Sequence, residues 1–209
     1  MFSGIVEAVE PILAAQTLPG AVRISVQKPT DFNDLHLGDS IATNGVCLTV
    51  EAYDQKTITF ALAAETLLIL KMDAHTLVGQ RVNLERSLRM GDRIHGHLVT
   101  GHVDSLGKVV RTEGQGESWF LDVEVSPTLS SLIWKKGSIT IQGVSLTVNE
   151  VAANRVSVCL IPETLKRTNL KDLRVGDFVN IEPDYFAKAL VHNFGDQLKS
   201  ILGDSKNEL

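Results

Sequence analysis

The sequence is poor in the features that mark several large classes of protein. Its only cysteines, Cys47 and Cys159, both lie in apolar, strand-like segments, which favours reduced thiols over a structural disulfide. No run of 18 or more apolar residues occurs, so no membrane-spanning helix is expected. The N-terminus also lacks the basic and apolar regions of a signal peptide. Together these absences favour a cytoplasmic protein.

Charge and motif content exclude further functions. The formal net charge of −5 disfavours nucleic acid and anionic membranes as partners, because both attract a basic surface. The chain lacks the dinucleotide motif G-x-G-x-x-G, the phosphate-binding P-loop, the hydrolase motif G-x-S-x-G and the redox motif C-x-x-C. Nothing therefore predicts a bound nucleotide, phosphoryl transfer or a serine hydrolase.

What the sequence does contain is an internal repeat. Residues 40–50 read SIATNGVCLTV, and residues 138–148, at an offset of 98, read SITIQGVSLTV. Three more blocks recur in the same order at nearly the same spacing, GIVEAV as GHVDSL, FALAAETL as VCLIPETL and VGQRVNLE as VGDFVNIE. The chain thus contains two copies of a unit of roughly one hundred residues. We expect domains at residues 1–92 and 93–185.

The pattern within each copy predicts β structure. Most segments are short, rich in β-branched residues and bounded by Gly, Asp, Asn or Pro. About six such strands without a crossover helix predict a closed or nearly closed antiparallel barrel. Residues 186–209 belong to neither copy, and their apolar residues recur at spacings of three and four, which predicts an amphipathic helix. This helix either packs on its own barrel or joins subunits.

The repeated L-T-V segment offers a candidate binding edge. Alternation along a strand sends Val46, Leu48 and Val50 to one face and Cys47 and Thr49 to the other. The second copy repeats this pattern with Ser145 and Thr147 in place of the thiol and hydroxyl. Such a strand either has small residues on its outer face for structural reasons or presents hydroxyls and backbone amides to an uncharged polar ligand.

Three histidines, His95, His97 and His102, cluster near the start of the second copy. No cysteine or carboxylate lies at metal-ligand spacing beside them, so no metal site is predicted. They are either surface or hydrogen-bonded structural histidines, or they transfer protons or bind ligand, since imidazole titrates near neutrality. His102 is the best placed because it falls inside a repeated block.

The two E-T-L blocks place a polar group where a strand is expected to end. Thr66 and Thr164 lie beside backbone that strand pairing no longer satisfies, so they either bind ligand or cap a short helix. Glu65 and Glu163 are either exposed acids or partners for a sugar-like hydroxyl.

These motifs taken together resemble riboflavin synthase of the α-chain type. The segments MFSGIVE, NGVCLTV, HLVTGHVD, KKGSITIQGVSLTV and IPETLKRTNL occur in that family's order, and the resemblance runs from Met1 to about Asp184. It implies an all-β fold of two tandem six-stranded Greek-key barrels plus a C-terminal helix. It also implies that the helix joins three subunits into a homotrimer, in which the N-terminal barrel of one subunit faces the C-terminal barrel of another. An association with lumazine synthase is compatible with this resemblance.

The resemblance implies a transferase that catalyses the last step of riboflavin biosynthesis. Two molecules of 6,7-dimethyl-8-ribityllumazine exchange a four-carbon unit and yield riboflavin and 5-amino-6-(ribitylamino)pyrimidine-2,4-dione. No cofactor is expected, because the substrate ring is itself the electron sink. In the implied mechanism, His102 or a water that it orients removes a proton from the acidic 7-methyl group of one molecule. Water or Cys47 adds to C7 of the other, and holding the two rings face to face accelerates their union.

The resemblance also implies a set of site residues. The expected catalytic residues are Ser40, Cys47, His102, Ser145 and Asp184. Gly4, Ile5 and Val6 serve the first pocket or are lent to the facing site. The remaining expected substrate-binding residues are Cys47, Leu48, Thr49, Ala61, Leu62, Ala63, Ala64, Glu65 and Thr66 in the first pocket, and Gly101, His102, Val103, Lys136, Ser145, Leu146, Thr147, Ile161, Pro162, Glu163, Thr164, Leu165 and Lys166 in the second.

The chain departs from the family pattern in two places. Gln142 stands where an aspartate is usual, which removes an acid that the family pattern places before V-S-L-T-V. Residues 68–72 replace the usual R-x-T-N-L, so the rim of the first pocket differs. Two other functions are compatible with such barrels, a lumazine-binding antenna protein without turnover and a flavin-dependent oxidoreductase. The second would need a nicotinamide domain, of which the sequence has no sign.

Overall fold

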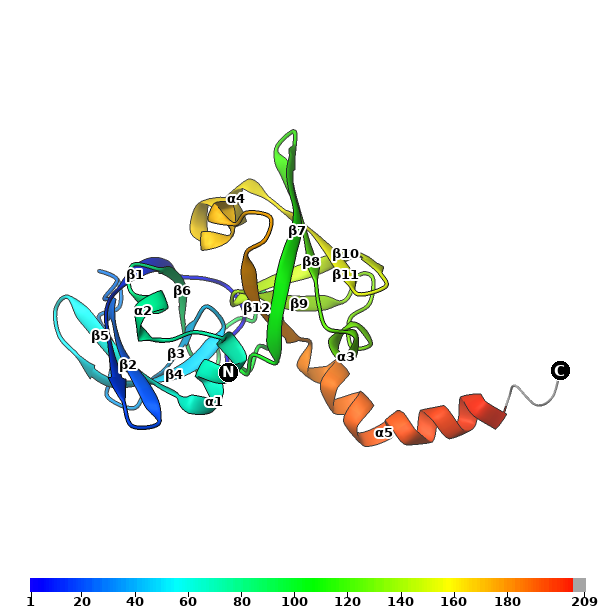
Figure 1. Cartoon of the computed structure of the whole chain (residues 1–209), viewed down its shortest axis with the longest axis horizontal. Coiled ribbons are helices and arrows are strands. Elements are labelled where there is room, and N and C mark those ends of the chain that lie inside the picture. The colour runs from blue at the N-terminus through cyan, green and yellow to red at the C-terminus, as the bar shows by residue number, and fades with distance from the viewer. Residues whose placement is uncertain (205–209) are drawn as a thin grey trace.

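The structure, a computed structural model, describes residues 1–204, with side chains through residue 195. Two β-barrels lie side by side, and a long helix leaves the second barrel (Figure 1). The first, here called the N-barrel, has the strand order β1-β2-β5-β4-β3-β6. Its elements are β1 (Ala8–Leu18), β2 (Ala21–Gln27), β3 (Ser40–Thr43), β4 (Val46–Tyr53), β5 (Thr57–Ala63), α1 (Ala64–Leu70), α2 (Ala74–Leu77) and β6 (Arg81–Arg86).

The second barrel, the C-barrel, repeats the same topology, with the order β10-β11-β8-β7-β12-β9 around the ring. Its elements are β7 (Ser105–Gln115), β8 (Ser118–Glu124), α3 (Pro127–Ser130), β9 (Ser138–Ile141), β10 (Val144–Ala152), β11 (Arg155–Leu160), α4 (Pro162–Arg167), the 3₁₀ helix η1 (Asn169–Asp172) and β12 (Phe178–Pro183). In the N-barrel, β3, β4 and β5 pair in succession, and β6 returns to pair with β3. In the C-barrel, β9, β10 and β11 pair in succession, and β12 returns to β9. This arrangement of four antiparallel strands is a Greek key. The predicted pair of six-stranded barrels is confirmed.

Each barrel has its own apolar core, built from the alternation that the sequence predicts. Val46, Leu48 and Val50 are buried in the N-barrel, whereas Cys47 is half-buried and Thr49 is exposed. The matching strand β10 shows the same pattern. Because inward residues alternate with outward ones, the thiol and hydroxyl side chains lie on the outer surface of the barrel wall.

Two tight turns lie back to back between the barrels. Asn44 and Gly45 join β3 to β4, Gln142 and Gly143 join β9 to β10, and all four residues have positive φ, as a type I′ hairpin requires. A Cβ atom on Gly143 would lie 2.6 Å from the Gly45 nitrogen. The two copies therefore meet at glycines that no larger residue can replace without moving the backbone.

Buried amide side chains surround these turns and link the barrels. Asn44 accepts a hydrogen bond from the Asn83 N–H at 2.8 Å, and Gln142 accepts the equivalent bond from the Asn180 N–H at 3.2 Å. The Asn83 side chain donates to the Gln142 carbonyl, and the Asn180 side chain donates to the Asn44 carbonyl, both at 2.8 Å. Gln142, where an acid is usual, is therefore a partner in the contact between the two copies.

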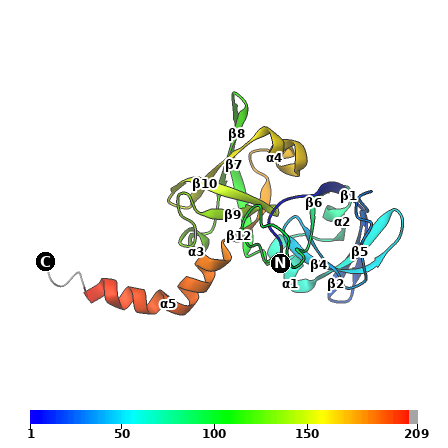
Figure 2. The same ribbon diagram turned by 180° about the vertical axis from the view of Figure 1, so that it is seen from behind.

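Helix α5 (Tyr185–Asp204) begins one residue before the predicted start and projects away from both barrels (Figures 1 and 2). Ala187 is buried, and the Lys188 Nζ bonds Asp104 at 2.9 Å, so the first turn is anchored on the C-barrel. Among the apolar residues that recur at spacings of three and four, Phe186 in the same turn and Leu190 and Phe194 farther along are exposed. The side chains of Leu198, Ile201 and Leu202 lie outside the described residues. No helix within residues 1–204 has the length and apolar character needed to cross a bilayer.

The contact between the two turns can be tested with Gly143→Ala. A positive φ alone costs an L-residue about 1–2 kcal/mol, and we expect the overlap with Gly45 to cost a further ~1–3 kcal/mol. Gly20→Ala is the matched control, since Gly20 has φ of +73° against +79° for Gly143, and open space around its Cβ position. Urea denaturation measures both variants. Equal losses of unfolding free energy would show that the turns do not restrain each other.

Candidate functional site

In each barrel, the strand that contains the L-T-V motif loses its neighbour on one side. The pairing of β4 with β5 ends at Val50 and Phe60, so residues 46–49 pair only with β3. In the C-barrel, the pairing of β10 with β11 likewise ends at Val148 and Val158. We call these two places the N-ladder end and the C-ladder end. A strand edge without a neighbour leaves backbone donors and acceptors to be satisfied by something else.

Part of that edge is occupied by a segment from the other copy. The Cys47 N–H donates to the Gly101 carbonyl at 2.9 Å, and the Ser145 N–H donates to the Gly4 carbonyl at 2.8 Å. Val103 packs against the core of the N-barrel, and Val6 is buried in the core of the C-barrel. We call residues 2–6 and 99–103 the opening segments. Each opening segment therefore lies on the motif strand of the other barrel.

A buried carboxylate holds each opening segment where it crosses. Glu85, on the last strand of the N-barrel, accepts bonds from the Ser3 N–H at 2.7 Å and the Gly4 N–H at 3.0 Å. Burial raises the pKa of Glu85, while the hydrogen bonds from Ser3 and Gly4 oppose that shift. Glu182 of the C-barrel binds the Thr100 and Gly101 N–H groups in the same way, at 2.8 and 3.1 Å.

The two opening segments also pair with each other. Phe2 and Val99 exchange backbone bonds of 2.8 and 3.0 Å, and the Phe2 side chain is fully buried. Phe2 forms a small apolar cluster with Val99 and Ala42, against which Cys47 packs. The position of both segments therefore depends on one aromatic side chain.

The environment of Ser145 is polar by comparison. The His97 Nδ1 lies 2.7 Å from the Ser145 Oγ, and the His97 Nε2 lies 3.1 Å from the Thr140 Oγ1. Burial lowers the pKa of His97, while the carboxylate of Asp184 opposes that shift. His97 is close in sequence to two other histidines, but no local pattern predicts its hydrogen-bond partners. Thr140 and Ser145 are more than forty residues away along the chain.

The five expected catalytic residues fall into two groups. Ser40 lies opposite Thr49 in the β3–β4 ladder, and Cys47 and the exposed His102 also belong to the N-ladder end. Ser145 lies at the C-ladder end, where Asp184 follows β12 and acts electrostatically on His97. A single chain thus offers two half-sites of different chemistry.

The expected substrate-binding residues also gather at the ladder ends. Thr49, Ala63, Ala64 and Glu65 are exposed, and Ala61 and Thr66 half-buried, at the N-ladder end and the start of α1. Thr147, Ile161, Pro162, Glu163 and Lys166 are exposed, and Thr164 half-buried, at the equivalent positions of the C-barrel. Leu48, Leu62 and Leu146 belong to the barrel cores, and Leu165 packs against the core of the C-barrel. Little of the surface of these four side chains is therefore accessible to a ligand.

Each opening segment lies on the barrel formed by the other copy. Gly101, His102 and Val103 were expected in the second pocket, but the structure lays their segment on the N-barrel. Gly4 and Val6 contact the C-barrel, in line with the alternative that the opening strand is lent to another site. Lys136 is exposed, and its N–H bonds the Val148 carbonyl at 2.8 Å, so it lies near the far end of the motif segment.

The altered segment 68–72 lies at the rim of the N-ladder end. It ends α1 and packs Leu70 and Met72 against its own barrel, with Leu68 exposed. The second copy keeps the family pattern, and there the Asn169 side chain reaches across to the N-barrel. It donates to the Asn44 Oδ1 at 3.0 Å and to the Arg81 carbonyl at 2.9 Å.

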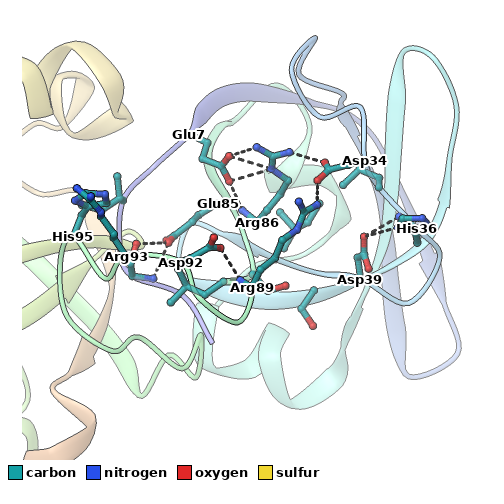
Figure 3. Close-up of a pocket in the computed structure, with 17 residues that line it drawn as sticks. Glu7, Asp34, His36, Asp39, Glu85, Arg86, Arg89, Asp92, Arg93 and His95 are labelled. Atoms are coloured by element: carbon teal, nitrogen blue, oxygen red, sulfur yellow. Dashed lines mark hydrogen bonds and ion pairs between the residues drawn. The ribbon is translucent and has the colours of Figure 1, made fainter.

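A cavity of about 690 Å³ lies between the start of the chain, the loop before β3 and the linker after β6 (Figure 3). Ser40 and Ile5 contribute to its wall, but its labelled side chains are mainly charged. Arg86 bonds both Glu7 and Asp34, and Arg89 also bonds Asp34, so these charges largely satisfy one another. No group of three His, Cys, Asp or Glu side chains suited to a metal ion occurs in the described part of the chain.

The variant Phe2→Ala tests the dependence of both half-sites on one side chain. Removing a fully buried phenylalanine costs about 3–5 kcal/mol of unfolding free energy, and both opening segments should loosen from Cys47 and Ser145. Hydrogen exchange at the Cys47 and Ser145 amides should accelerate in the variant. Phe178→Ala removes an exposed ring and is the control. Unchanged exchange at both amides would contradict this role for Phe2.

Comparison with known proteins agrees with this geometry. A lumazine binding domain model matches twice, at residues 3–87 and 100–184. The chain is 39% identical to riboflavin synthase of Photobacterium phosphoreum over 90% of its length and 86% of that protein. It is 36% identical to riboflavin synthase of Actinobacillus pleuropneumoniae, covering 97% of this chain and 95% of that one.

Among solved structures, LumP complexed with 6,7-dimethyl-8-(1'-D-ribityl) lumazine has the same fold, with a TM-score of 0.76 and 22% identity. The match covers 88% of this chain and 99% of LumP. The repeated domain and the identity to riboflavin synthases over nearly the whole chain lead to one conclusion. This chain belongs to the riboflavin synthase family and is an enzyme of riboflavin biosynthesis.

Proposed function

We propose that each ladder end holds one molecule of 6,7-dimethyl-8-ribityllumazine and that the two molecules exchange a four-carbon unit. The products are riboflavin and 5-amino-6-(ribitylamino)pyrimidine-2,4-dione. The observation that carries this proposal is the pair of equivalent strand edges that lose their barrel neighbour, each covered only in part by an opening segment, which bonds Cys47 in one and Ser145 in the other. Two copies of one pocket suit a reaction that consumes two copies of one substrate.

The chemistry of the edges suits an uncharged heterocycle. Free backbone groups on a strand can pair with the amide-like edge of a ring, much as a neighbouring strand would. The Thr49 and Thr147 hydroxyls project from the same outer faces. Glu65 and Glu163, at the starts of α1 and α4, are exposed and able to accept bonds from the hydroxyls of the ribityl chain.

The half-sites divide the chemical roles. The N-ladder end supplies Ser40, the thiol of Cys47 and the imidazole of His102, while the C-ladder end supplies Ser145 and Asp184. A base at one half-site would deprotonate the methyl group of one lumazine, and a nucleophile at the other would add to C7 of the second lumazine. The two rings would then join, and further proton transfers would let the products separate. Holding two reactants in contact converts a bimolecular step into an effectively unimolecular one.

We propose that complete active sites form between subunits of a cytoplasmic homotrimer, with residues 1–92 of one chain facing residues 93–185 of another. The support is the apolar row on α5, whose residues Phe186, Leu190 and Phe194 are exposed in the single chain. An apolar face of this kind is stabilised when a second copy covers it. The helix would then hold the subunits together while the barrels face one another.

The decisive experiment incubates the pure protein with the lumazine alone. We expect riboflavin at one molecule per two substrates consumed, without added metal or nucleotide, followed by fluorescence and chromatography. A protein that binds the lumazine but forms no riboflavin would instead be an antenna-type binding protein. That outcome would reject the proposed dismutation.

A second prediction concerns assembly. The double variant Leu190→Asp/Phe194→Asp places two charges on the exposed row, and burying a charge in an apolar contact is strongly unfavourable. We expect sedimentation to show monomers and turnover to fall at least ~100-fold, because no site would then have both halves. Leu13→Asp, at an exposed apolar residue of β1, is the control. A variant that is monomeric and fully active would reject the intersubunit site.

A further inference from the structure

The two half-sites differ in more than one residue. Cys47 of the N-barrel corresponds to Ser145 of the C-barrel, and Ala42 corresponds to Thr140 at the same offset of 98. In the N-barrel, the side chain that covers this pair is the ring of Phe2. In the C-barrel, the imidazole of His97 contacts both hydroxyls. Two corresponding positions that are apolar or weakly polar on one side are therefore polar on the other, and the side chain that lies over them differs in the same sense.

The C-barrel positions form a connected set. The contacts of 2.7 Å to the Ser145 Oγ and 3.1 Å to the Thr140 Oγ1 use both ring nitrogens of His97. Thr140 is buried on β9, and Ser145 is half-buried on the strand that pairs with it. The backbone N–H of His97 donates to the Ser3 carbonyl at 3.2 Å, so the residue is held at both its ring and its main chain.

The charge state of His97 suits proton acceptance. Burial lowers the pKa of its imidazole from the usual 6.5, and the opposing effect of Asp184 is smaller. A neutral imidazole has one nitrogen that donates and one that accepts. If Nε2 donates to the Thr140 hydroxyl, Nδ1 is free to accept the proton of the Ser145 hydroxyl.

We propose that His97 is a positioning residue of the C-barrel half-site, and that it orients Ser145 as a proton carrier by accepting the Ser145 hydroxyl proton at Nδ1. This inference rests on the proposed function, because it deepens the role of the same half-site. A proton released by the ligand at the C-ladder end passes to the Ser145 Oγ while the Ser145 proton passes to the His97 Nδ1. The same path in reverse returns one proton to the departing product, so no net proton is gained.

The arrangement also distinguishes the two half-sites. In the N-barrel, Cys47 packs against the apolar cluster of Phe2, Ala42 and Val99. No acid or base among the described residues is hydrogen-bonded to the Cys47 thiol. We therefore assign the Ser145 side to proton carriage during the joining and parting of the rings, and the His102 imidazole remains the only base proposed at the other half-site.

The test compares variants of the full-length protein. His97→Leu should lower kcat about 100-fold, in the range of general acid–base catalysis, with KM changed less than about twofold. Asparagine and glutamine can accept a hydrogen bond but cannot take up a proton. His97→Asn and His97→Gln should therefore also be about 100-fold slower than the wild type, whereas a role limited to filling space or orienting Ser145 would leave at least one of them near the wild-type rate. His75→Leu, at an exposed residue of α2, is the control.

A double-mutant cycle tests whether His97 acts through Ser145. If it does, Ser145→Ala/His97→Leu should be no slower than Ser145→Ala alone, because the two residues act as one unit. Independent, multiplicative losses would overturn the proposal, as would an effect of His97→Leu on KM alone. If His97→Leu does not fold, the Asn and Gln variants decide, and a kcat near the wild-type value in either of them would overturn it. A wild-type protein that makes no riboflavin would reject the proposed function instead.

Discussion

The structure depends on the exchange of opening segments between its two barrels. Each motif strand lacks a neighbour over part of its length, and the other copy supplies one at Cys47–Gly101 and Ser145–Gly4. Because a buried strand edge cannot leave its amides unpaired, each barrel is completed only in the presence of the other. Glu85 and Glu182 hold the crossing points, and Phe2 joins the two segments. The pairing of the opening segments thus shapes both ladder ends.

The backbone of the two barrels is nearly symmetric, but the side chains above their motif strands differ. The glycine turns, the crossing carboxylates and the strand order repeat from one copy to the other. The side chains above the motif strands do not, since a phenylalanine covers one and a histidine covers the other. A duplicated fold can keep its backbone contacts unchanged and still assign different tasks to its copies, because outward side chains on a strand are not needed for the core.

Much of the fold was predictable from the sequence, and the exchange was not. Period-two alternation correctly placed Cys47 and Ser145 outside the barrel cores, and the repeat correctly indicated two six-stranded units. The contact of Gly4 with Ser145 spans most of the chain and leaves no local pattern, since the backbone makes it. Gly101 and His102 were expected in the second pocket because they belong to the second copy in the sequence. Their segment lies on the N-barrel, through a backbone contact that also leaves no local pattern.

Gln142 shows why a departure from a family pattern is hard to interpret from sequence alone. In the sequence it stands out only as a lost acid, yet its side chain is buried between the barrels and accepts a bond from the Asn180 N–H. An amide oxygen can accept that bond without burying a charge, which a carboxylate could not avoid unless it was protonated or paired. Asn44, its counterpart in the first copy, is also an amide and accepts the equivalent bond from Asn83. With an amide at both positions, the two copies make equivalent hydrogen bonds where their turns meet.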